Sequence, residues 1–403
     1  MGRGVSFMMQ APIKLAFPLI GRGTWTGGYV YLKNTLRLIQ SRLKNEIQPF
    51  VFLSPEENEK YGQELSPLAE GRLIVDPSIG YSGRGSSLAE AILTGRDRKL
   101  ELLLKSHGIQ VVFEIASFYG ARFGIPVVAW MPDYQHRHMP EMFTRSNWWR
   151  RDLGFRMQIR SGRTLMLSSE TARNDMEKFY PKSRGRGHVV RFAIDLDIKT
   201  HIGQGPAMCK KYDLPNRFFY LPNQFWKHKN HATIIEALTL LKRENKLDSL
   251  PPIILSGLNK DIRNPSHFDD LMHQVNAAGI ESNFRFLGLI PYSDVLNLAG
   301  SCDTLINPSF FEGWSTPIEE AKALGAPLLL SDIPLHREQA PDAVFADPKS
   351  SAAFSVALLK IGSRTATTRK PTSVLVENQE LRLSQHSQSL LKTVQDAARN
   401  AIK

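Results

Sequence analysis

Short apolar runs of strand length alternate along the chain with longer stretches of helical periodicity. In the first half these runs lie at residues 13–20, 48–53, 110–115, 127–131 and 164–168. The alternation begins again after a polar stretch, with runs at residues 218–221, 253–256, 284–287, 304–306 and 327–330. Such alternation is typical of parallel sheets covered by helices on both faces. The pattern therefore predicts two successive α/β domains, each with a doubly wound parallel sheet.

The change from one domain to the next is expected between residues 194 and 216. This stretch contains residues that favour turns, namely Gly203, Gly205, Pro206 and Pro215. We therefore predict a first domain at residues 1–195 and a second at residues 196–377. Residues 378–403 have the pattern of an amphipathic terminal helix that needs a partner surface.

The composition agrees with a globular protein of two domains. A chain of 403 residues exceeds one ordinary domain, and its 42% hydrophobic and 22% charged content is ordinary for globular proteins. We find no apolar run suited to a membrane span or a secretory signal, so the expected location is the cytoplasm. Cys209 and Cys302 are far apart and show no metal-ligand spacing, so we expect reduced thiols and no metal site.

Positive charge is concentrated in the first half of the chain. The formal net charge is +12, and residues 1–195 hold 28 Lys and Arg against 18 Asp and Glu. A basic surface suits nucleic acid, an anionic membrane or a phosphorylated substrate, and charge alone does not choose among them. Because no nucleic-acid-binding motif accompanies the charge, nucleic acid is not an expected partner.

Residues 145–163 contain six arginines interleaved with aromatic residues. Helical spacing predicts that Trp149 and Phe155 turn inward, while four arginines stay in water: Arg145, Arg156, Arg160 and Arg163. An ordinary amphipathic helix is the default interpretation. Contact with an anionic membrane is the alternative, because basic helices with aromatic residues bind such surfaces.

The segment at residues 305–347 is the most informative part of the chain. A strand, a loop and a helix follow one another, and the helix start has Thr316 as N-cap, Pro317 next and Glu319 as the capping-box partner. The backbone N–H groups of residues 313–316 and the helix dipole would together attract a phosphate group.

Glu312 and Glu320 flank this expected phosphate site. Carboxylates repel phosphate but accept strong hydrogen bonds from hydroxyl groups, so the two side chains suit a hexose and a ribose respectively. The alternative is that Glu312 is a solvated loop charge and that Glu320 only compensates the helix dipole.

Seven residues separate Glu312 from Glu320, and Gly325-Ala326-Pro327 and Ser331-Asp332 follow. In these features the segment resembles the family 4 retaining glycosyltransferases, which have the GT-B fold. The first Glu of that family contacts the donor sugar and the second contacts the ribose, so the resemblance implies these roles for Glu312 and Glu320. It also places the following residues in the donor site: Gly313, Trp314, Ser315 and Thr316.

Residues 219–231 resemble the family's strand, loop and helix that bind the diphosphate through an Arg and a Lys. Lys229 falls on the Lys, and Gln224 falls on the Arg, or Asn223 if the loop is shifted. An amide donates hydrogen bonds but does not neutralise charge. More of the diphosphate charge is therefore expected to fall on Lys229 and the helix N-terminus.

In the first domain, Gly27 and Gly28 precede an expected helix at residues 30–39 and resemble the family's Gly-Gly loop beside the donor phosphate. Asp133 matches an Asp in the loop after a strand, whereas Pro132 stands where the family often has a His. His136 and His138 line the acceptor side in one interpretation and are ordinary core or surface residues in the other.

The resemblance implies metal-independent, retaining transfer of a hexose from a nucleoside diphosphate sugar to a saccharide or lipid-linked acceptor. Glu312, Lys229 and Asp133 would be the catalytic residues, and no cofactor is expected besides the donor. The implied process is polysaccharide or glycolipid biosynthesis, with the terminal helix crossing back to the first domain and peripheral contact at the inner face of the membrane. Two alternatives stay open: a sugar-nucleotide epimerase of the same fold, and a non-catalytic sugar-nucleotide-binding protein, which Gln224 and Pro132 favour.

Overall fold

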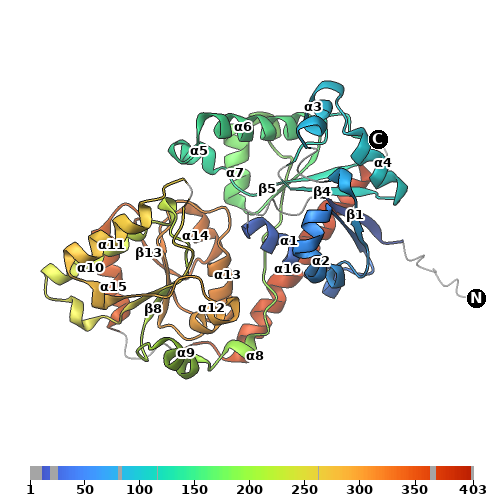
Figure 1. Cartoon of the computed structure of the whole chain (residues 1–403). Coiled ribbons are helices and arrows are strands. Elements are labelled where there is room, and N and C mark those ends of the chain that lie inside the picture. The colour runs from blue at the N-terminus through green and yellow to red at the C-terminus, as the bar shows by residue number, and fades with distance from the viewer. Residues whose placement is uncertain are drawn as a thin grey trace, which may run out of the picture. The chain divides into compact units, whose positions relative to one another are not determined.

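The computed structural model describes residues 11–18, 26–79, 84–115, 117–261, 263–363 and 369–400. The chain divides into two compact units (Figure 1). The first comprises Met1–Phe192 together with Leu383–Lys403, and the second comprises Ala193–Arg382.

The first unit is built on a parallel sheet of seven strands. The strands are β1 (Ile13–Pro18), β2 (Ile47–Leu53), β3 (Leu73–Val75), β4 (Val111–Ile115), β5 (Val127–Met131), β6 (Thr164–Leu167) and β7 (Gly187–Val189). Their order in the sheet is β3-β2-β1-β4-β5-β6-β7. Every residue of β5 is buried, as expected for a central strand that helices cover on both faces.

Helices and short 3-10 turns connect these strands. They are α1 (Thr26–Arg42), α2 (Pro55–Leu68), η1 (Pro77–Ile79), α3 (Arg84–Thr94), α4 (Arg98–Ser106), α5 (Gln135–His138), η3 (Pro140–Met142), α6 (Arg145–Arg160), α7 (Glu170–Phe179) and η4 (Pro181–Ser183). α2 shows how the local sequence sets a boundary. Ser54 and Glu57 form a complete capping box at its start.

The second unit contains a parallel sheet of six strands. The strands are β8 (Phe219–Leu221), β9 (Ile253–Leu255), β10 (Phe284–Phe286), β11 (Thr304–Asn307), β12 (Leu328–Ser331) and β13 (Val344–Ala346). Their order is β10-β9-β8-β11-β12-β13. Its helices and turns are α8 (Ile198–His201), α9 (Gly205–Tyr212), η5 (Lys227–Lys229), α10 (His231–Arg243), η6 (Leu247–Ser249), α11 (His267–Ala278), η7 (Glu281–Asn283), α12 (Tyr292–Ala299), α13 (Thr316–Ala323), α14 (Pro334–Gln339) and α15 (Ser351–Gly362). The predicted α/β architecture with two doubly wound sheets is confirmed.

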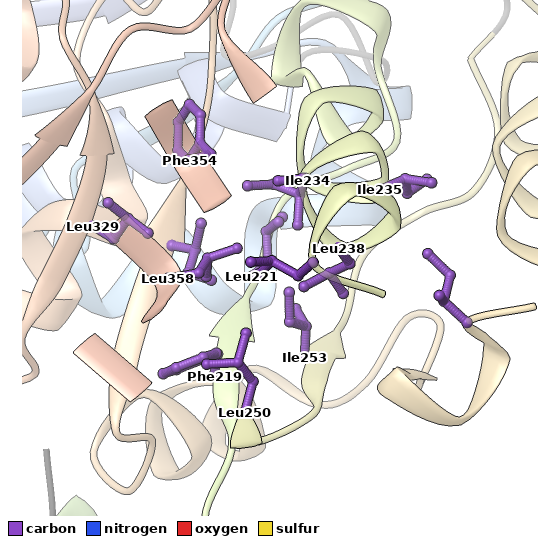
Figure 2. Close-up of a cluster of buried hydrophobic side chains, with 14 of the residues drawn as sticks. Phe219, Leu221, Ile234, Ile235, Leu238, Leu250, Ile253, Leu329, Phe354 and Leu358 are labelled. Carbon is purple, nitrogen blue, oxygen red and sulfur yellow. The ribbon is translucent and has the colours of Figure 1, made fainter. Parts of the chain in front are cut away.

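Apolar side chains from helices and strands form the core of the second unit. Figure 2 shows one of its clusters, in which Ile234 and Leu238 of α10 and Phe354 of α15 are buried with apolar side chains of the sheet. Burial of such a cluster is the main favourable contribution to the folding of the unit, at about 25 cal/mol for each Å² of apolar surface removed from water. Cys302 is buried in a second cluster, and Cys209 is partly exposed.

The last helix is α16 (Thr372–Arg399), which begins before the predicted residue 378. It belongs to the second unit up to Arg382 and to the first unit from Leu383 on. Leu383, Leu390 and Val394 are buried, so the helix has a continuous apolar face. None of the helices in the described ranges is long and apolar enough to cross a membrane.

Candidate functional site

The strand order of the second unit reverses direction between β8 and β11. In open α/β sheets, ligands bind beyond the carboxyl ends of the two strands at such a reversal. The loop after β8 leads to η5 and α10, and the loop after β11 leads to α13. The two segments that carry the expected chemistry therefore meet at the position that the fold favours for a ligand.

Lys229 and Glu312 form an ion pair across this edge of the sheet. Lys229 Nζ lies 2.7 Å from Glu312 Oε1, and the two side chains are only 13% and 8% exposed. Burial alone would raise the pKa of Glu312, but the charge and hydrogen bond of Lys229, together with His336 and His228, outweigh it and the pKa falls to about 2. Glu312 is therefore ionised at neutral pH. The negative charge beside Lys229 is thus a carboxylate of the protein itself, that of Glu312.

Asn307, the last residue of β11, connects the two loops. Its side chain accepts a hydrogen bond from Asn223 Nδ2 (3.2 Å) and donates one to Ser315 Oγ (2.9 Å). Ser309 Oγ lies 2.8 Å from Glu312 Oε1 and 2.6 Å from Asn307 Oδ1. These buried amide and hydroxyl groups have partners, as buried polar groups require, and they hold the Glu312 loop in one conformation.

Further hydrogen bonds fix the backbone of the same loop from outside. Asn230 adopts the left-handed conformation with φ 59° and donates to the Pro308 carbonyl at 2.9 Å. Ser331 Oγ donates to the Ser309 carbonyl at 2.6 Å, and the Phe310 N–H donates to the His228 carbonyl at 2.9 Å. The loop is thus anchored on β12 and on the η5 segment, so its carboxylate is preorganised.

The start of α13 differs from the predicted capping box. Ser315, not Thr316, is the N-cap, and no side chain caps the helix. Glu319 is buried and pairs with Lys322 (2.8 Å) and Gln339 (3.0 Å). The capping prediction was wrong because the helix begins one residue earlier than expected and Glu319 is held by Lys322 and by Gln339, which lies 20 residues further along the chain.

The side chain of Gln339 binds both backbone groups of Ser315. It accepts from the Ser315 N–H at 3.2 Å and donates to the Ser315 carbonyl at 2.8 Å. The Ser315 N–H therefore donates to Gln339 within the protein. The prediction that this N–H group binds a phosphate was wrong. The N–H groups of Gly313, Trp314 and Thr316 remain the backbone candidates for a donor phosphate.

Glu320 has an environment opposite to that of Glu312. Its side chain is buried, and Tyr292 Oη donates a hydrogen bond to Glu320 Oε1 at 2.7 Å. Burial raises the pKa of Glu320 to about 7, and the Tyr292 hydrogen bond partly offsets that effect. The two carboxylates at the E-x7-E spacing therefore differ in ionisation near neutral pH.

The two candidates for the missing Arg position are distinguished by their burial. Asn223 is buried and its amide is bound to Asn307, whereas Gln224 is partly exposed. The loop lies so close to Gly257 that a Cβ there would come within 2.6 Å of the Asn223 carbonyl oxygen. Gln224 is thus the residue whose amide is accessible to a ligand.

In the first unit, the described part of the chain resumes at Thr26, directly before Gly27 and Gly28. Gly27 and Gly28 belong to the first turn of α1 instead of a preceding loop. Asp133 accepts a hydrogen bond from Arg151 at 2.6 Å and another from the Gln135 N–H at 2.8 Å.

The two histidines of the predicted acceptor side have different environments. His136 is fully buried among aromatic rings, its Nε2 lies 3.2 Å from the Tyr180 hydroxyl, and burial lowers its pKa to about 4. It therefore belongs to the core and has no surface to offer an acceptor. His138 is partly exposed and lies 2.7 Å from Asp175 Oδ2.

Sequence reasoning missed four residues that hold the loop and Glu320, namely Asn307, Ser309, Gln339 and Tyr292, and it named Ser331 only as part of the motif. Asn307 and Ser331 end apolar strands, and a polar residue at the carboxyl end of a buried strand is a signal that could have indicated them. Among the described residues, no group of three or more His, Cys, Asp or Glu could hold a metal ion.

Comparison with known proteins agrees with this geometry. Residues 210–371 match the family described as glycosyl transferases group 1. The matched range lies within the second unit. Its matched range includes Lys229, Glu312 and Glu320, so the predicted resemblance is confirmed at the level of the group; no finding tests family 4 itself.

A curated relative and several solved structures are also similar to this chain. O-antigen chain mannosyltransferase B of Escherichia coli is 28% identical over 207 residues, which are 50% of this chain and 51% of that protein. The match thus spans about half the length of that relative. A glycosyltransferase from Rickettsia africae has a TM-score of 0.69 at 14% identity, over 97% of this chain and 99% of its own.

Alr3699/HepE of Anabaena, in complex with UDP and glucose, has a TM-score of 0.64 at 15% identity, over 96% of this chain and 99% of its own. At such identities the likeness to solved structures shows the fold, which is GT-B, over nearly the whole chain. The predicted fold is confirmed.

A double-mutant cycle tests whether Lys229 and Glu312 depend on each other. Lys229→Met and Glu312→Gln should each lower the free energy of unfolding by about 3 kcal/mol, because each leaves the other group buried without its partner. The double variant should lose less than the sum, by about 1 kcal/mol or more, in urea titrations. The exposed pair of Lys246 and Glu244 is the control, with an expected coupling near zero. Additive losses at Lys229 and Glu312 would contradict the pairing.

Proposed function

We propose that the protein is a retaining glycosyltransferase that moves a sugar from a nucleoside diphosphate sugar to a hydroxyl of a saccharide or lipid-linked acceptor. The observation that carries the proposal is the buried pair of Lys229 and Glu312 at the β8–β11 reversal of a group 1 domain. The relative in Escherichia coli, by its name a mannosyltransferase of O-antigen chains, supports a role in polysaccharide or glycolipid biosynthesis.

In this proposal the ion pair exchanges partners when the donor binds. Lys229 turns from Glu312 to the diphosphate, and Glu312 accepts hydrogen bonds from hydroxyls of the transferred sugar. Glu312 is ionised in the paired state that receives the donor, where its pKa is about 2. A pair that is already desolvated loses little additional hydration when the ligand arrives, so both charges are ready for the donor.

The departing diphosphate is stabilised by several groups. Lys229 supplies a positive charge, and the N–H groups of Gly313, Trp314 and Thr316 supply the positive end of the α13 dipole. Gln224 adds an uncharged donor, and Gly27 and Gly28 are proposed to approach the phosphates from the start of α1. The proposal includes no metal or cofactor besides the donor.

The reaction then proceeds on one face of the sugar. The bond between the anomeric carbon and the diphosphate oxygen breaks, and its electron pair leaves with the diphosphate. The acceptor oxygen bonds to the anomeric carbon from the same face, and its proton passes to the departing diphosphate. Asp133 is proposed as a carboxylate on the acceptor side, where Arg151 holds it.

Turnover of nucleoside diphosphate sugars tests the proposal. The protein should release nucleoside diphosphate from at least one member of a panel that includes UDP-glucose and GDP-mannose, and Glu312→Gln should lower kcat about 100-fold, because the sugar is no longer positioned. The exposed Glu281→Gln, in the same unit, is the matched control.

Incubation with the donor alone separates the remaining alternatives. An epimerase would convert the sugar nucleotide without an acceptor, and a non-catalytic binding protein would shift the melting temperature without any turnover. Near-normal transfer by Glu312→Gln would refute the assignment of this residue.

We further propose that α6 contacts an anionic membrane. Contrary to the predicted helical spacing, Trp149 points outward and is 64% exposed, together with Leu153 at 50%. Arg163 is buried against Glu114, so it is not one of the solvated arginines. Exposed Trp and Leu side chains one turn apart, beside the exposed Arg145, suit an interface of anionic headgroups.

Sedimentation with lipid vesicles tests this surface. The protein should bind vesicles that contain phosphatidylglycerol, and the double change Trp149→Ala and Leu153→Ala should lower the bound fraction about tenfold, because the apolar contact is lost. Leu102→Ala, at a 69% exposed residue of the same unit, is the control. Equal binding of the double variant and the control would contradict a contact through α6.

A further inference from the structure

Tyr292 is the first residue of α12, and Glu320 lies one helix further along the chain in α13. We propose that Tyr292 is a positioning residue for the donor, whose hydroxyl holds one oxygen of Glu320 and leaves the other for the ribose hydroxyls. The inference rests on the proposed function, because it assigns a task within the same donor site. The supporting distance is 2.7 Å between Tyr292 Oη and Glu320 Oε1.

The two residues are exposed to very different degrees. Glu320 is 3% exposed, whereas Tyr292 is 52% exposed. Both helices begin at the carboxyl edge of the sheet, α12 after β10 and α13 after β11. The phenol therefore lies between a buried carboxylate and the solvent, on the same edge as the Glu312 loop.

The groups around Glu320 show why the Tyr292 hydroxyl is important for the ionised form of this carboxylate. Lys322, on the same helix, is paired with Glu319. Tyr220 of β8 also faces Glu320, but it is buried and its hydroxyl is bound to Ser256 at 2.6 Å. Among the described residues, no cation forms an ion pair with Glu320 within 4.0 Å. Tyr292 is thus the group that stabilises the ionised form directly.

The anchoring of α12 does not depend on the Tyr292 hydroxyl. Asp294 is buried and bound by Lys211 at 2.6 Å and by Tyr212 at 2.5 Å. Leu296 and Leu298 are buried in the core of the unit. Replacing the exposed phenol by a phenyl ring therefore removes the hydrogen bond to Glu320 and leaves these anchoring contacts of α12 in place.

The ionisation of Glu320 gives this pair a pH dependence. Burial raises the pKa of Glu320 to about 7, and the Tyr292 hydrogen bond lowers it relative to burial alone. Only the ionised carboxylate accepts hydrogen bonds from both ribose hydroxyls and Tyr292. Affinity for a nucleoside diphosphate should therefore rise with pH through about 7, and loss of the Tyr292 hydroxyl should move this rise to higher pH.

Titration calorimetry with UDP, GDP, ADP and CDP on both sides of neutral pH tests the inference. For the nucleotide that binds, Tyr292→Phe should weaken affinity at pH 7 about tenfold, as expected for one lost hydrogen bond to a charged group. The loss should shrink at higher pH, and the 2′,3′-dideoxy form of that nucleotide should bind both proteins equally. Tyr212→Phe is the matched control, because it removes a hydrogen bond from a tyrosine of α9 to a carboxylate of α12, Asp294, and not to Glu320.

A double variant separates positioning from a general structural effect. In a Glu320→Gln background, Tyr292→Phe should cause no further loss, and the pH dependence should disappear. An unshifted pH profile in Tyr292→Phe, or an equal loss for the dideoxy form, would overturn the inference alone. If the unaltered protein binds none of the four nucleotides, the proposed function fails and the inference fails with it.

Discussion

The ion pair between Lys229 and Glu312 is the interaction on which the rest of the site depends. Two charges placed in a largely buried position are costly unless they are paired and hydrogen-bonded. The second unit meets this requirement with Asn307 and Ser309 around the carboxylate, and with β12 beneath the loop. The strand reversal between β8 and β11 brings the two loops together, so the fold supplies the geometry that the pair needs.

The two glutamates at the E-x7-E spacing have different tasks because their surroundings differ. Glu312 lies beside a cation and has its pKa lowered to about 2, whereas Glu320 lies beside a neutral phenol and has its pKa raised to about 7. The first is ionised while it is paired with Lys229. The second titrates near neutral pH, and the Tyr292 hydrogen bond lowers its pKa relative to burial alone.

Much of the fold could be predicted from the sequence because its central strands are apolar runs bounded by turns. The three-residue strands β3, β7 and β13 were missed, although the equally short β8, β9 and β10 were predicted. Glu312 and Lys229 could be predicted because each lies in a recognisable local sequence motif. Their pairing, the role of Gln339 at Ser315 and the burial of His136 could not, because these contacts join segments that are distant in sequence. Trp149 was misplaced because helical periodicity does not show which face is covered.

A structure with a bound nucleoside diphosphate sugar would test the central claim most directly. The distances from Lys229 Nζ to Glu312 and to the diphosphate oxygens would be measured in the complex. We predict that Lys229 leaves Glu312 for the diphosphate and that Glu312 lies within hydrogen-bond distance of a sugar hydroxyl. A complex in which the 2.7 Å pair stays closed, with the donor bound elsewhere, would contradict the claim.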